Sequence, residues 1–452
     1  MTGSGARPTG TLHGLGAEVP LARLAQASCL GGRLEELRGR VVMLAMRDQL
    51  TAALAMIELD GVAQRMVLCP PELSADHALA VARESGAQAW LGDVPAPDEA
   101  GLAVSLSVTA EPRACRAGLE RRPSHLTEWI LLTSATTGAP KLVQHTLASL
   151  TSAFAHEPLA SGTVIWSTFY DIRRYGGLQI FLRALYCGSI VLSNPSERVA
   201  DFLARVGAAG ITHISGTASH WRRALMSGAC SSMVPRYVRL SGEIADQAIL
   251  DALHAAYPNA SVEHAFATTE AGLAFEVGDG LAGFPASLVG APGASVELKI
   301  AAGTLRVRSA GTAIRYLSGQ TTSLRDSDGF VDTGDRVELR NGRYYFLGRS
   351  GGVINVGGLK VHPEEVEAVI NSHPRVRMSR VMARRSPITG AVVSAEIVLA
   401  DLVGVPAPED VLKHEIIEHC QRSLASHKVP AIIRFVASLE VSAAGKLVRP
   451  NA

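Results

Sequence analysis

The chain has 452 residues, of which 43 are basic and 42 are acidic. This length allows two or three domains with a large buried core, and the near-zero net charge argues against nucleic acid or a membrane surface as a partner. The N-terminus lacks the apolar stretch of a secretory signal, and no run of about eighteen apolar residues follows it, so we expect a cytoplasmic protein.

The first third of the chain predicts an α/β layer. Residues 1–35 are rich in glycine and predict an irregular arm with one helix at 21–27. Apolar runs and helical patterns then alternate, which favours a parallel, Rossmann-like sheet with helices on its faces. The runs and helices, in order, are 41–46, 48–59, 66–69, 74–85 with Ser74 as its N-cap, and 87–91.

The same alternation resumes after residue 146 and predicts a second Rossmann-like subdomain. Its expected helices and strands, in order, are 147–154, 164–167, 177–185, 189–192, 199–206, 213–215, 219–226 and 237–240.

Beyond residue 288 the pattern changes to short alternating strands, which predicts a small β-rich subdomain with a hairpin at 337–347 turning at Asn341-Gly342. After Arg349 a smaller α+β domain is expected on a flexible neck. We therefore divide the chain into an N-terminal domain, 1–349, and a mobile C-terminal domain, 350–452. The elements expected in the second domain are 363–371, 380–383, 394–399, 408–424 and 432–435.

A stretch rich in hydroxyls, Thr133 to Lys141, follows an apolar strand at 129–132. It should therefore emerge at the carboxyl end of a strand, where open α/β sheets bind ligands. Hydroxyl and amide donors, a glycine and a lysine together suit phosphate, although such clusters are also common in solvated turns. The pattern favours phosphate binding over a plain loop.

This stretch resembles the phosphate loop of the adenylate-forming superfamily, which includes acyl-CoA synthetases, adenylation domains and luciferases. The usual loop reads Thr-Ser-Gly-Thr-Thr-Gly-x-Pro-Lys, and Ala135 stands here at the first glycine. The resemblance implies that ATP binds through Thr133, Ser134, Thr136, Thr137, Gly138 and Lys141.

Two further segments resemble superfamily motifs. Ser241, Gly242 and Glu243 match the turn that borders adenine. Phe266, Ala267, Thr268, Thr269 and Glu270 match the run Tyr-Gly-x-Thr-Glu, although the last three residues read alone are typical of a capping box. The resemblance implies a stacking ring at Phe266, and a carboxylate at Glu270 that acts in catalysis and holds Mg²⁺.

The C-terminal third carries the remaining motifs. Asp335 and Arg349 lie at the spacing of the superfamily's ribose-binding pair, and Gly351 stands where the hinge residue is usually Asp or Lys. Lys446, in a Gly-Lys motif, resembles the catalytic lysine that contacts the carboxylate and the α-phosphate. A solvated lysine and a structural ion pair are the plain alternatives.

The acid substrate is expected beside two segments that follow predicted strands, 169–177 and 213–217. Core packing explains either tyrosine of the first segment nearly as well, while Arg173, Arg174 and His220 would suit an acid that bears a hydroxyl. The candidate substrate residues are Tyr170, Arg174, Tyr175, Gly176, Ser215 and Gly216.

The resemblance implies an AMP-forming ligase that uses ATP and Mg²⁺ to activate a small, aromatic carboxylic acid in secondary metabolism. The acyl group would pass to the thiol of coenzyme A or of an acyl carrier protein, and the ligase would be a monomer or homodimer. One alternative is a stand-alone amino-acid adenylation enzyme, for which Asp171 would hold the ammonium group. Another is a catalytically silent nucleotide-binding paralogue.

Overall fold

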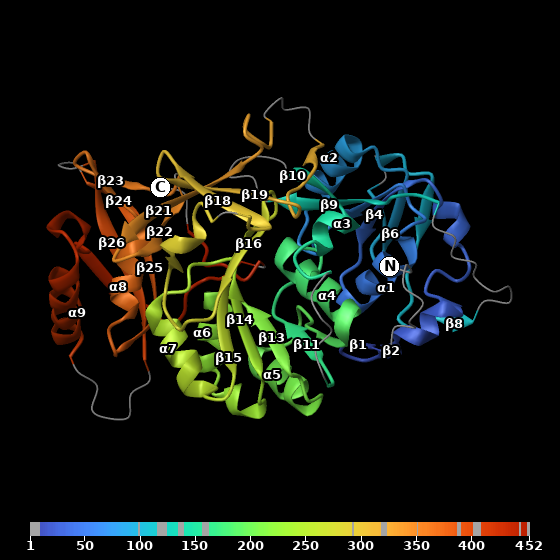
Figure 1. The fold of residues 1–452 in the computed structure, drawn as a ribbon. Coiled ribbons are helices and arrows are strands. Elements are labelled where there is room, and N and C mark those ends of the chain that lie inside the picture. The colour runs from blue at the N-terminus through green and yellow to red at the C-terminus, as the bar shows by residue number, and fades with distance from the viewer. Residues whose placement is uncertain are drawn as a thin grey trace.

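The computed structural model describes residues 10–97, 100–114, 124–133, 140–155, 162–291, 293–317, 323–349, 351–386, 390–400, 408–442 and 444–449. Two α/β layers, a β-rich part and a smaller C-terminal α+β part follow one another along the chain (Figure 1). This is the predicted fold class.

The first α/β layer is a sheet of order β20-β10-β9-β5-β4-β6-β7, in which β4, β5, β6, β7 and β9 run parallel. β10 and β20 pair antiparallel at one edge. The bounds are β4 Val41–Ala45, β5 Arg65–Leu68, β6 Ala89–Gly92, β7 Val104–Leu106, β9 Glu128–Thr133, β10 Lys141–Thr146 and β20 Arg315–Tyr316.

The second layer is a sheet of order β16-β15-β14-β13-β11-β12-β1-β2. Its central strands run parallel, so the carboxyl ends of β11, β13, β14 and β15 lie along one edge. The bounds are β1 Thr11–His13, β2 Glu18–Pro20, β11 Ile165–Thr168, β12 Ser189–Leu192, β13 His213–Gly216, β14 Tyr237–Ser241, β15 Ser261–Thr268 and β16 Gly272–Val277.

Helices cover both faces of the two sheets (Figure 1). α1 and α4 pack between the sheets, in a core that joins strand residues such as Val42 and Ile190 to Leu178 of α4. α5 to α7 cover the other face of the second sheet, and α2 covers that of the first. The bounds are α1 Gln49–Leu59, α2 Ala75–Ser85, α3 Leu147–Thr151, α4 Tyr175–Cys187, α5 Val199–Ala208, α6 Ala218–Met226 and α7 Gln247–Ala256.

Side-chain caps begin several of these helices. Asp48 accepts a hydrogen bond from Thr51 N at 3.0 Å, and Ser74, the predicted cap of α2, accepts one from His77 N at 3.3 Å. The sequence prediction was wrong at the N-terminus, where a 3₁₀ helix, Leu21–Ala25, replaces the expected helix and β1 adds to the second sheet beside β12.

The β-rich sheet has the order β17-β22-β21-β19-β18. Its hairpin turns at Asn341-Gly342, as predicted, and both residues have positive φ, 48° and 77°, as a tight hairpin turn requires. The bounds are β17 Phe284–Pro285, β18 Val296–Ala301, β19 Thr304–Ser309, β21 Val331–Arg340 and β22 Arg343–Arg349.

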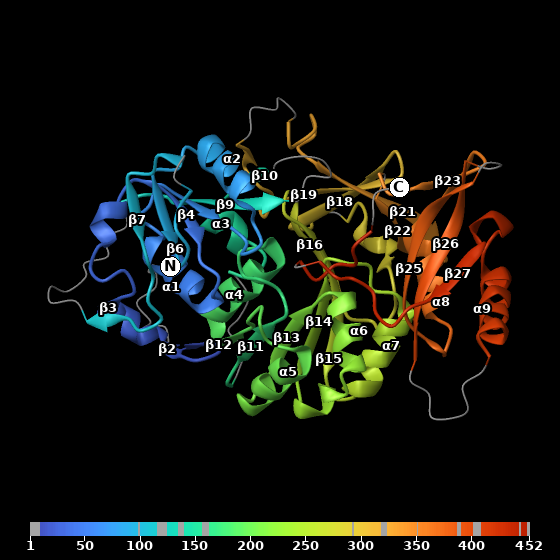
Figure 2. The ribbon, with the colours of Figure 1, turned by 180° about the vertical axis from the view of Figure 1, so that it is seen from behind.

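Residues after Gly351 build a separate hydrophobic core, in which Ile354 and Val366 contact side chains of the sheet β25-β26-β27 and of α9. Figure 2 shows this small domain beside the β-rich part and the helices α6 and α7. The bounds are β23 Ile354–Val356, β24 Leu359–Val361, α8 Pro363–Asn371, β25 Val376–Ser386, β26 Gly390–Leu399, α9 Glu409–Ser423 and β27 Ile432–Phe435.

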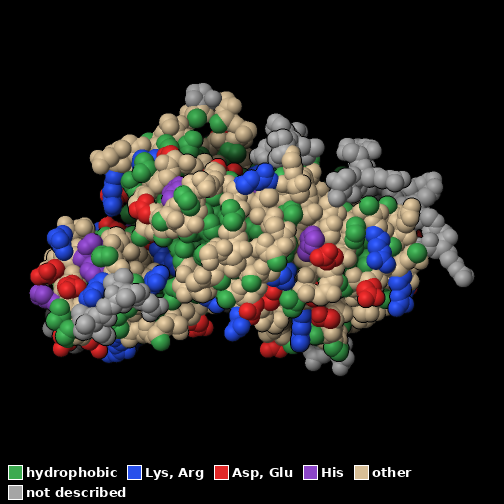
Figure 3. Space-filling view, turned by 90° about the horizontal axis from the view of Figure 1, so that it is seen from below, with side chains coloured by type: hydrophobic (Ala, Val, Ile, Leu, Met, Phe, Trp, Pro, Cys, Tyr) green, Lys and Arg blue, Asp and Glu red, His purple; other side chains and the backbone are tan. Residues whose placement is uncertain are grey.

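The surface carries both signs of charge. On the face in Figure 3, acidic and basic side chains are interspersed, in keeping with the balance of 43 and 42 along the chain. Within the described parts of the chain, no helix combines the length and apolar character needed to cross a membrane.

Candidate active site

The predicted phosphate loop joins two paired strands. Thr133, the last residue of β9, lies opposite Lys141, the first residue of β10. The Lys141 ammonium lies over the ring of Tyr316, 5.3 Å from its centroid. The predicted contacts of Ser134, Thr136, Thr137 and Gly138 lie outside the described residues, so at this loop the structure places Thr133 and Lys141.

Glu270 follows the carboxyl end of β15 and faces the same region. Its carboxylate accepts a hydrogen bond from the Tyr316 hydroxyl at 3.2 Å, so Tyr316 contacts both Glu270 and Lys141. His145 of β10 supports the segment that carries Glu270, because its Nε2 lies 2.7 Å from the carbonyl of the preceding residue, Thr269. Burial lowers the pKa of His145 to about 4, so the ring is neutral and donates this bond from Nε2.

Asp335 and Arg349 are brought together by the register of the β21-β22 hairpin, in which they face each other across the two strands. Arg349 Nε lies 3.4 Å from Asp335 Oδ1. The second oxygen, Asp335 Oδ2, is buried and has no hydrogen-bond partner among the described residues. Burial raises the pKa of Asp335, while Arg349 and Lys446 act in the opposite direction. The carboxylate therefore has a free acceptor.

Lys446 approaches this hairpin from the C-terminal segment, which crosses back from the small domain to the large one (Figure 2). A Cβ atom placed on Gly242 would lie 3.6 Å from Lys446 Cε, so the stem of the lysine lies against the β14 turn. Lys446 is exposed, and its side chain lines the larger cavity. Burial lowers the pKa of Lys446, and the charges of Arg349 and Arg174 lower it further.

Most of the residues predicted to bind ATP line two neighbouring cavities, and Thr268 and Arg349 line both of them. The smaller cavity, of about 330 Å³, also holds Lys141 and Glu270, with Tyr316 and Thr333. The larger cavity, of about 630 Å³, also holds Gly242, Glu243, Phe266, Ala267, Asp335 and Lys446. Residues of the large domain and of the C-terminal segment therefore line two cavities that share Thr268 and Arg349.

The candidate adenine residues have different surroundings. The Phe266 ring stacks on Phe346, with centroids 4.6 Å apart, and also lines the larger cavity. Ser241 ends β14, and its carbonyl accepts a hydrogen bond from the Tyr170 hydroxyl at 2.6 Å. The Glu243 carboxylate accepts hydrogen bonds from Ser219 and from the Leu447 backbone, so it joins the large domain to the C-terminal segment.

The candidate acid-binding residues lie at the carboxyl ends of β11 and β13. Tyr170, Tyr175, Ser215 and Gly216 are buried, and a Cβ on Gly216 would lie 2.7 Å from the Phe169 ring. A Cβ on Gly176 would lie 3.7 Å from the Tyr170 ring. These residues pack against one another beside the larger cavity's Gly242, but they do not line the two cavities.

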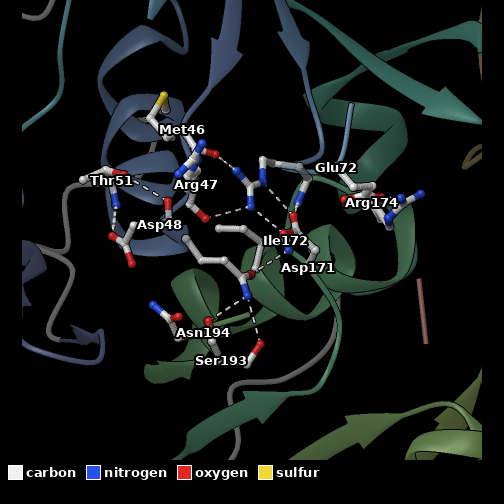
Figure 4. Close-up of polar contacts among 12 residues, drawn as sticks. Met46, Arg47, Asp48, Thr51, Glu72, Asp171, Ile172, Arg174, Ser193 and Asn194 are labelled. Carbon is white, nitrogen blue, oxygen red and sulfur yellow. Dashed lines mark hydrogen bonds and ion pairs between the residues drawn. The ribbon is translucent and has the colours of Figure 1, made fainter. Parts of the chain in front are cut away.

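Arg173 and Asp171 form a buried structural pair. The Arg173 side chain is fully buried, and its Nη2 lies 2.5 Å from Asp171 Oδ2. Figure 4 shows Asp171 beside Met46 and Arg47, whose carbonyls also accept hydrogen bonds from the Arg173 guanidinium. Arg174 points elsewhere and pairs with Glu72. Asp171 is therefore already neutralised by Arg173.

The comparisons with known proteins agree with this arrangement. Residues 24–313 match the family described as AMP-binding enzyme, and residues 365–446 match the AMP-binding enzyme C-terminal domain. The chain belongs to the AMP-binding enzyme family.

Curated relatives of this AMP-binding enzyme include the human mitochondrial acyl-coenzyme A synthetase ACSM5, which is 36% identical over 131 residues, 29% of this chain and 22% of the relative. The acyl-CoA ligase ppsA of Aspergillus oryzae is 27% identical over 348 residues, 70% of this chain and 60% of the relative. The matches thus span about a fifth to three fifths of these relatives.

Solved structures share the fold of this AMP-binding enzyme. The anthranilate CoA ligase AuaEII in complex with anthranoyl-AMP is 19% identical, covers 98% of this chain and 93% of its own, and has a TM-score of 0.79. The amide bond synthetase McbA from Marinactinospora thermotolerans is 21% identical, covers 97% of this chain and 96% of its own, and has a TM-score of 0.75.

Sequence reasoning missed several residues at the site of this AMP-binding enzyme. Tyr316 lies on a short edge strand far from any motif, and the spacing of the sequence gives no signal for its contact with Glu270. Thr217 lies in a segment predicted to contact the acid, whereas it caps α6 and donates to the Gly445 carbonyl at 2.5 Å. Contacts between residues so far apart along the chain require the tertiary structure.

Replacing Arg173 by Met should destabilise this AMP-binding enzyme by about 3–5 kcal/mol, because the Asp171 charge would stay buried without its cation. Chemical denaturation measures the loss, and adding Asp171→Asn should restore part of it. Arg198→Met is the matched control, since Arg198 pairs with Asp201 on the surface at 2.8 Å and its loss should change stability little. Equal losses for Arg173 and Arg198 would contradict a structural role for the buried pair.

Proposed function

We propose that this chain is an AMP-forming ligase that activates a small aromatic carboxylic acid as an acyl adenylate and transfers the acyl group to a thiol. The thiol belongs to coenzyme A or to the phosphopantetheine of a carrier protein. The observation that carries the proposal is the meeting of Lys446 with Asp335 and Arg349 at one cavity, although the small domain supplies the lysine and the large domain the other two.

The free acceptor of Asp335 supports ATP binding. Oδ2 is buried and has no hydrogen-bond partner in the described part of the chain, and ribose hydroxyls are donors that would satisfy it, with Arg349 donating to the same sugar. Lys141 and the predicted phosphate loop supply donors and positive charge for the phosphates. Phe266 offers an aromatic face for the adenine beside the larger cavity.

Glu270 is the proposed Mg²⁺ ligand. A carboxylate suits this hard cation, which usually binds to one or two protein oxygens together with substrate phosphates and water. When bound, the ion neutralises phosphate charge. The hydrogen bond from Tyr316 orients the carboxylate toward the cavity that Lys141 also lines.

In the first step, an oxygen of the substrate carboxylate attacks the α-phosphorus of ATP and pyrophosphate leaves. Negative charge from two anions accumulates where they meet, and Lys446 offsets it as a positioned cation. In the second step, the thiolate attacks the acyl carbon and AMP leaves. We propose that residues 350–452 rotate about Gly351 between the two steps, with the small domain's own hydrophobic core moving as a unit.

The choice of an aromatic acid is supported by the structural likeness to an anthranilate CoA ligase and to an o-succinylbenzoate CoA synthetase from Bacillus subtilis. The Asp171 pairing with Arg173 weighs against an amino-acid substrate, because the carboxylate is not available to hold an ammonium group. Pyrophosphate release measured over a panel of aryl, alkyl and amino acids tests the proposal. Release with aryl acids supports it, release only with amino acids favours the adenylation alternative, and no release with any acid favours the silent paralogue.

Glu270→Gln should raise the Mg²⁺ concentration needed for half-maximal pyrophosphate release by about tenfold, because a neutral amide binds the ion less strongly than a carboxylate. A Mg²⁺ titration with the best acid of the panel measures this shift. Tyr316→Phe is the matched variant, since it keeps the ring under Lys141 and removes the hydroxyl that orients Glu270, so its shift should be smaller. An unchanged titration for Glu270→Gln would exclude Glu270 as a ligand.

A further inference from the structure

A tight turn near the C-terminus presents Lys446 to the site. Ser442 N donates to the Lys446 carbonyl at 2.7 Å, and Gly445 N donates to the Ser442 carbonyl at 2.8 Å. Val441 and Leu447 pair across this turn in an antiparallel bridge. We call residues 444–447 the tail turn. Its own hydrogen bonds give it a defined shape, so whatever holds the tail turn also places Lys446.

The N-terminus of α6, in the large domain, receives the tail turn. The hydroxyl of Thr217 accepts a hydrogen bond from His220 N at 3.0 Å, which caps the helix, and donates its own proton to the Gly445 carbonyl at 2.5 Å. Thr217 is fully buried. One hydroxyl thus joins the cap of α6 to the residue just before Lys446.

Glu243 holds the other side of the tail turn. One carboxylate oxygen accepts from Ser219 N at 2.7 Å. The other accepts from the Ser219 hydroxyl at 3.0 Å and from Leu447 N at 2.8 Å. The large domain therefore contacts the residue before Lys446 through Thr217 and the residue after it through Glu243.

The shape of the contact requires glycine at position 445. Gly445 has a φ of +72°, and a Cβ atom there would lie 1.7 Å from His220 Cε1. The His220 ring is itself held, because it stacks on Phe169 with centroids 5.3 Å apart. Burial, and then the charge of Arg223, lower the pKa of His220 to about 3, so the receiving surface is neutral at this ring.

We propose that Thr217 and Glu243 are positioning residues that latch the tail turn, and so select the domain orientation in which Lys446 serves adenylation. This inference rests on the proposed function for its catalytic consequence. Thr217 is not needed for transfer of the acyl group to the thiol, because the latch must open before the small domain rotates. Gly351 provides no charge to bias the hinge, which leaves the orientation to contacts such as these.

Thr217→Val removes the hydroxyl at nearly constant volume and should lower pyrophosphate release by about tenfold, while the transfer of benzoyl from added benzoyl adenylate to coenzyme A stays at the level of the unmodified protein. Thr217→Ser keeps both the cap and the donor, and should restore adenylation. Glu243→Ala is the second variant for adenylation alone, because it loosens the same turn and keeps the Thr217 hydroxyl as the cap of α6, although Ser219 N loses an acceptor. Equal losses of Thr217→Val in both half-reactions would overturn the latch.

A measurement of domain orientation tests the latch without any acid. Spin labels are placed on V234C in the large domain and V411C on α9, where the exposed fractions are 83% and 47%. Cys115 and Cys187 are replaced by serine, since the other four cysteines are buried. In the presence of ATP and Mg²⁺, the distance between the two labels should form one narrow population when Thr217 and Glu243 are unchanged. Thr217→Val should add a second population.

Identical distance distributions for Thr217→Val, Glu243→Ala and the unmodified latch would overturn the inference. If no acid supports pyrophosphate release, the proposed function fails, but the distances still decide whether Thr217 and Glu243 set the orientation. If release is normal in every variant, the proposed function stands and the latch fails. The two proposals therefore fail separately.

Discussion

Lys446→Ala should reduce pyrophosphate release by roughly a hundredfold to a thousandfold, because the variant loses the cation that offsets charge as two anions meet. The fold should be unchanged, since the Lys446 side chain lies at a cavity and the tail turn is held by backbone hydrogen bonds. Stopped assays of pyrophosphate at saturating ATP measure the loss. Transfer from benzoyl adenylate to coenzyme A should be affected far less.

Lys413→Ala is the matched control for Lys446→Ala. It removes a lysine from the same small domain, where the ammonium lies 2.6 Å from Glu409 on the surface of α9. Adenylation should be unaffected, because Lys413 lines neither of the two cavities. A normal rate for Lys446→Ala would remove the lysine from the mechanism.

The pH dependence of adenylation should also show the loss of the proton from Lys446. Burial and the nearby charges of Arg349 and Arg174 lower the pKa of this lysine from 10.5. Because the charged form is the active one, the rate should be constant while the lysine is protonated and should fall as the pH rises through the lowered pKa. Lys446→Arg should move this alkaline decline to higher pH, because guanidinium keeps its proton.

Asp335→Asn should weaken ATP binding by roughly tenfold to a hundredfold, because ribose loses a charged acceptor. Calorimetric titration with ATP measures the change. The same variant should raise the free energy of unfolding at neutral pH by about 1 kcal/mol, since it removes a buried carboxylate oxygen that has no partner among the residues that the structure describes. The substitution should therefore weaken ATP binding and increase stability, as expected of a residue whose role is to bind a ligand.

The sign of the stability effect follows from the pKa. Burial raises the pKa of Asp335 above 3.8, so the native protein binds more protons than the unfolded chain between the two values, and stability falls as the pH rises through that window. The advantage of Asp335→Asn should therefore disappear in acid. Glu338→Gln is the control, since Glu338 lies on the same strand but is exposed, and it should change neither property. A loss of stability in Asp335→Asn would contradict this account.

Much of the fold could be predicted because its signals are local. The run at 41–46 contains the buried strand β4, and Ser74, the predicted cap, begins α2. Asn341-Gly342 gave the hairpin, and that hairpin sets Asp335 opposite Arg349. For the site, the order of motifs identified which side chains meet at the two cavities.

The features that the sequence did not predict depend on contacts between residues that are far apart along the chain. β1 has three residues, with Leu12 as its only large apolar side chain, and it forms because β12 offers an edge some hundred and eighty residues later. Thr217 has the sequence signature of a helix cap, and nothing local indicates that its proton goes to Gly445. Asp171 and Arg173 lie in a segment predicted to contact the acid, but Arg173 donates instead to the carbonyls of Met46 and Arg47 and pairs with Asp171.

In the proposed mechanism, a carboxylate attacks the α-phosphorus of an ATP held between the two domains. An acid from the panel that carries heavy oxygen in its carboxylate tests this step. After complete reaction with ATP and coenzyme A, mass spectrometry should find one labelled oxygen in AMP, because thiol attack breaks the acyl carbon–oxygen bond and leaves that oxygen on phosphorus. Unlabelled AMP, or ADP formed together with labelled phosphate, would contradict the claim.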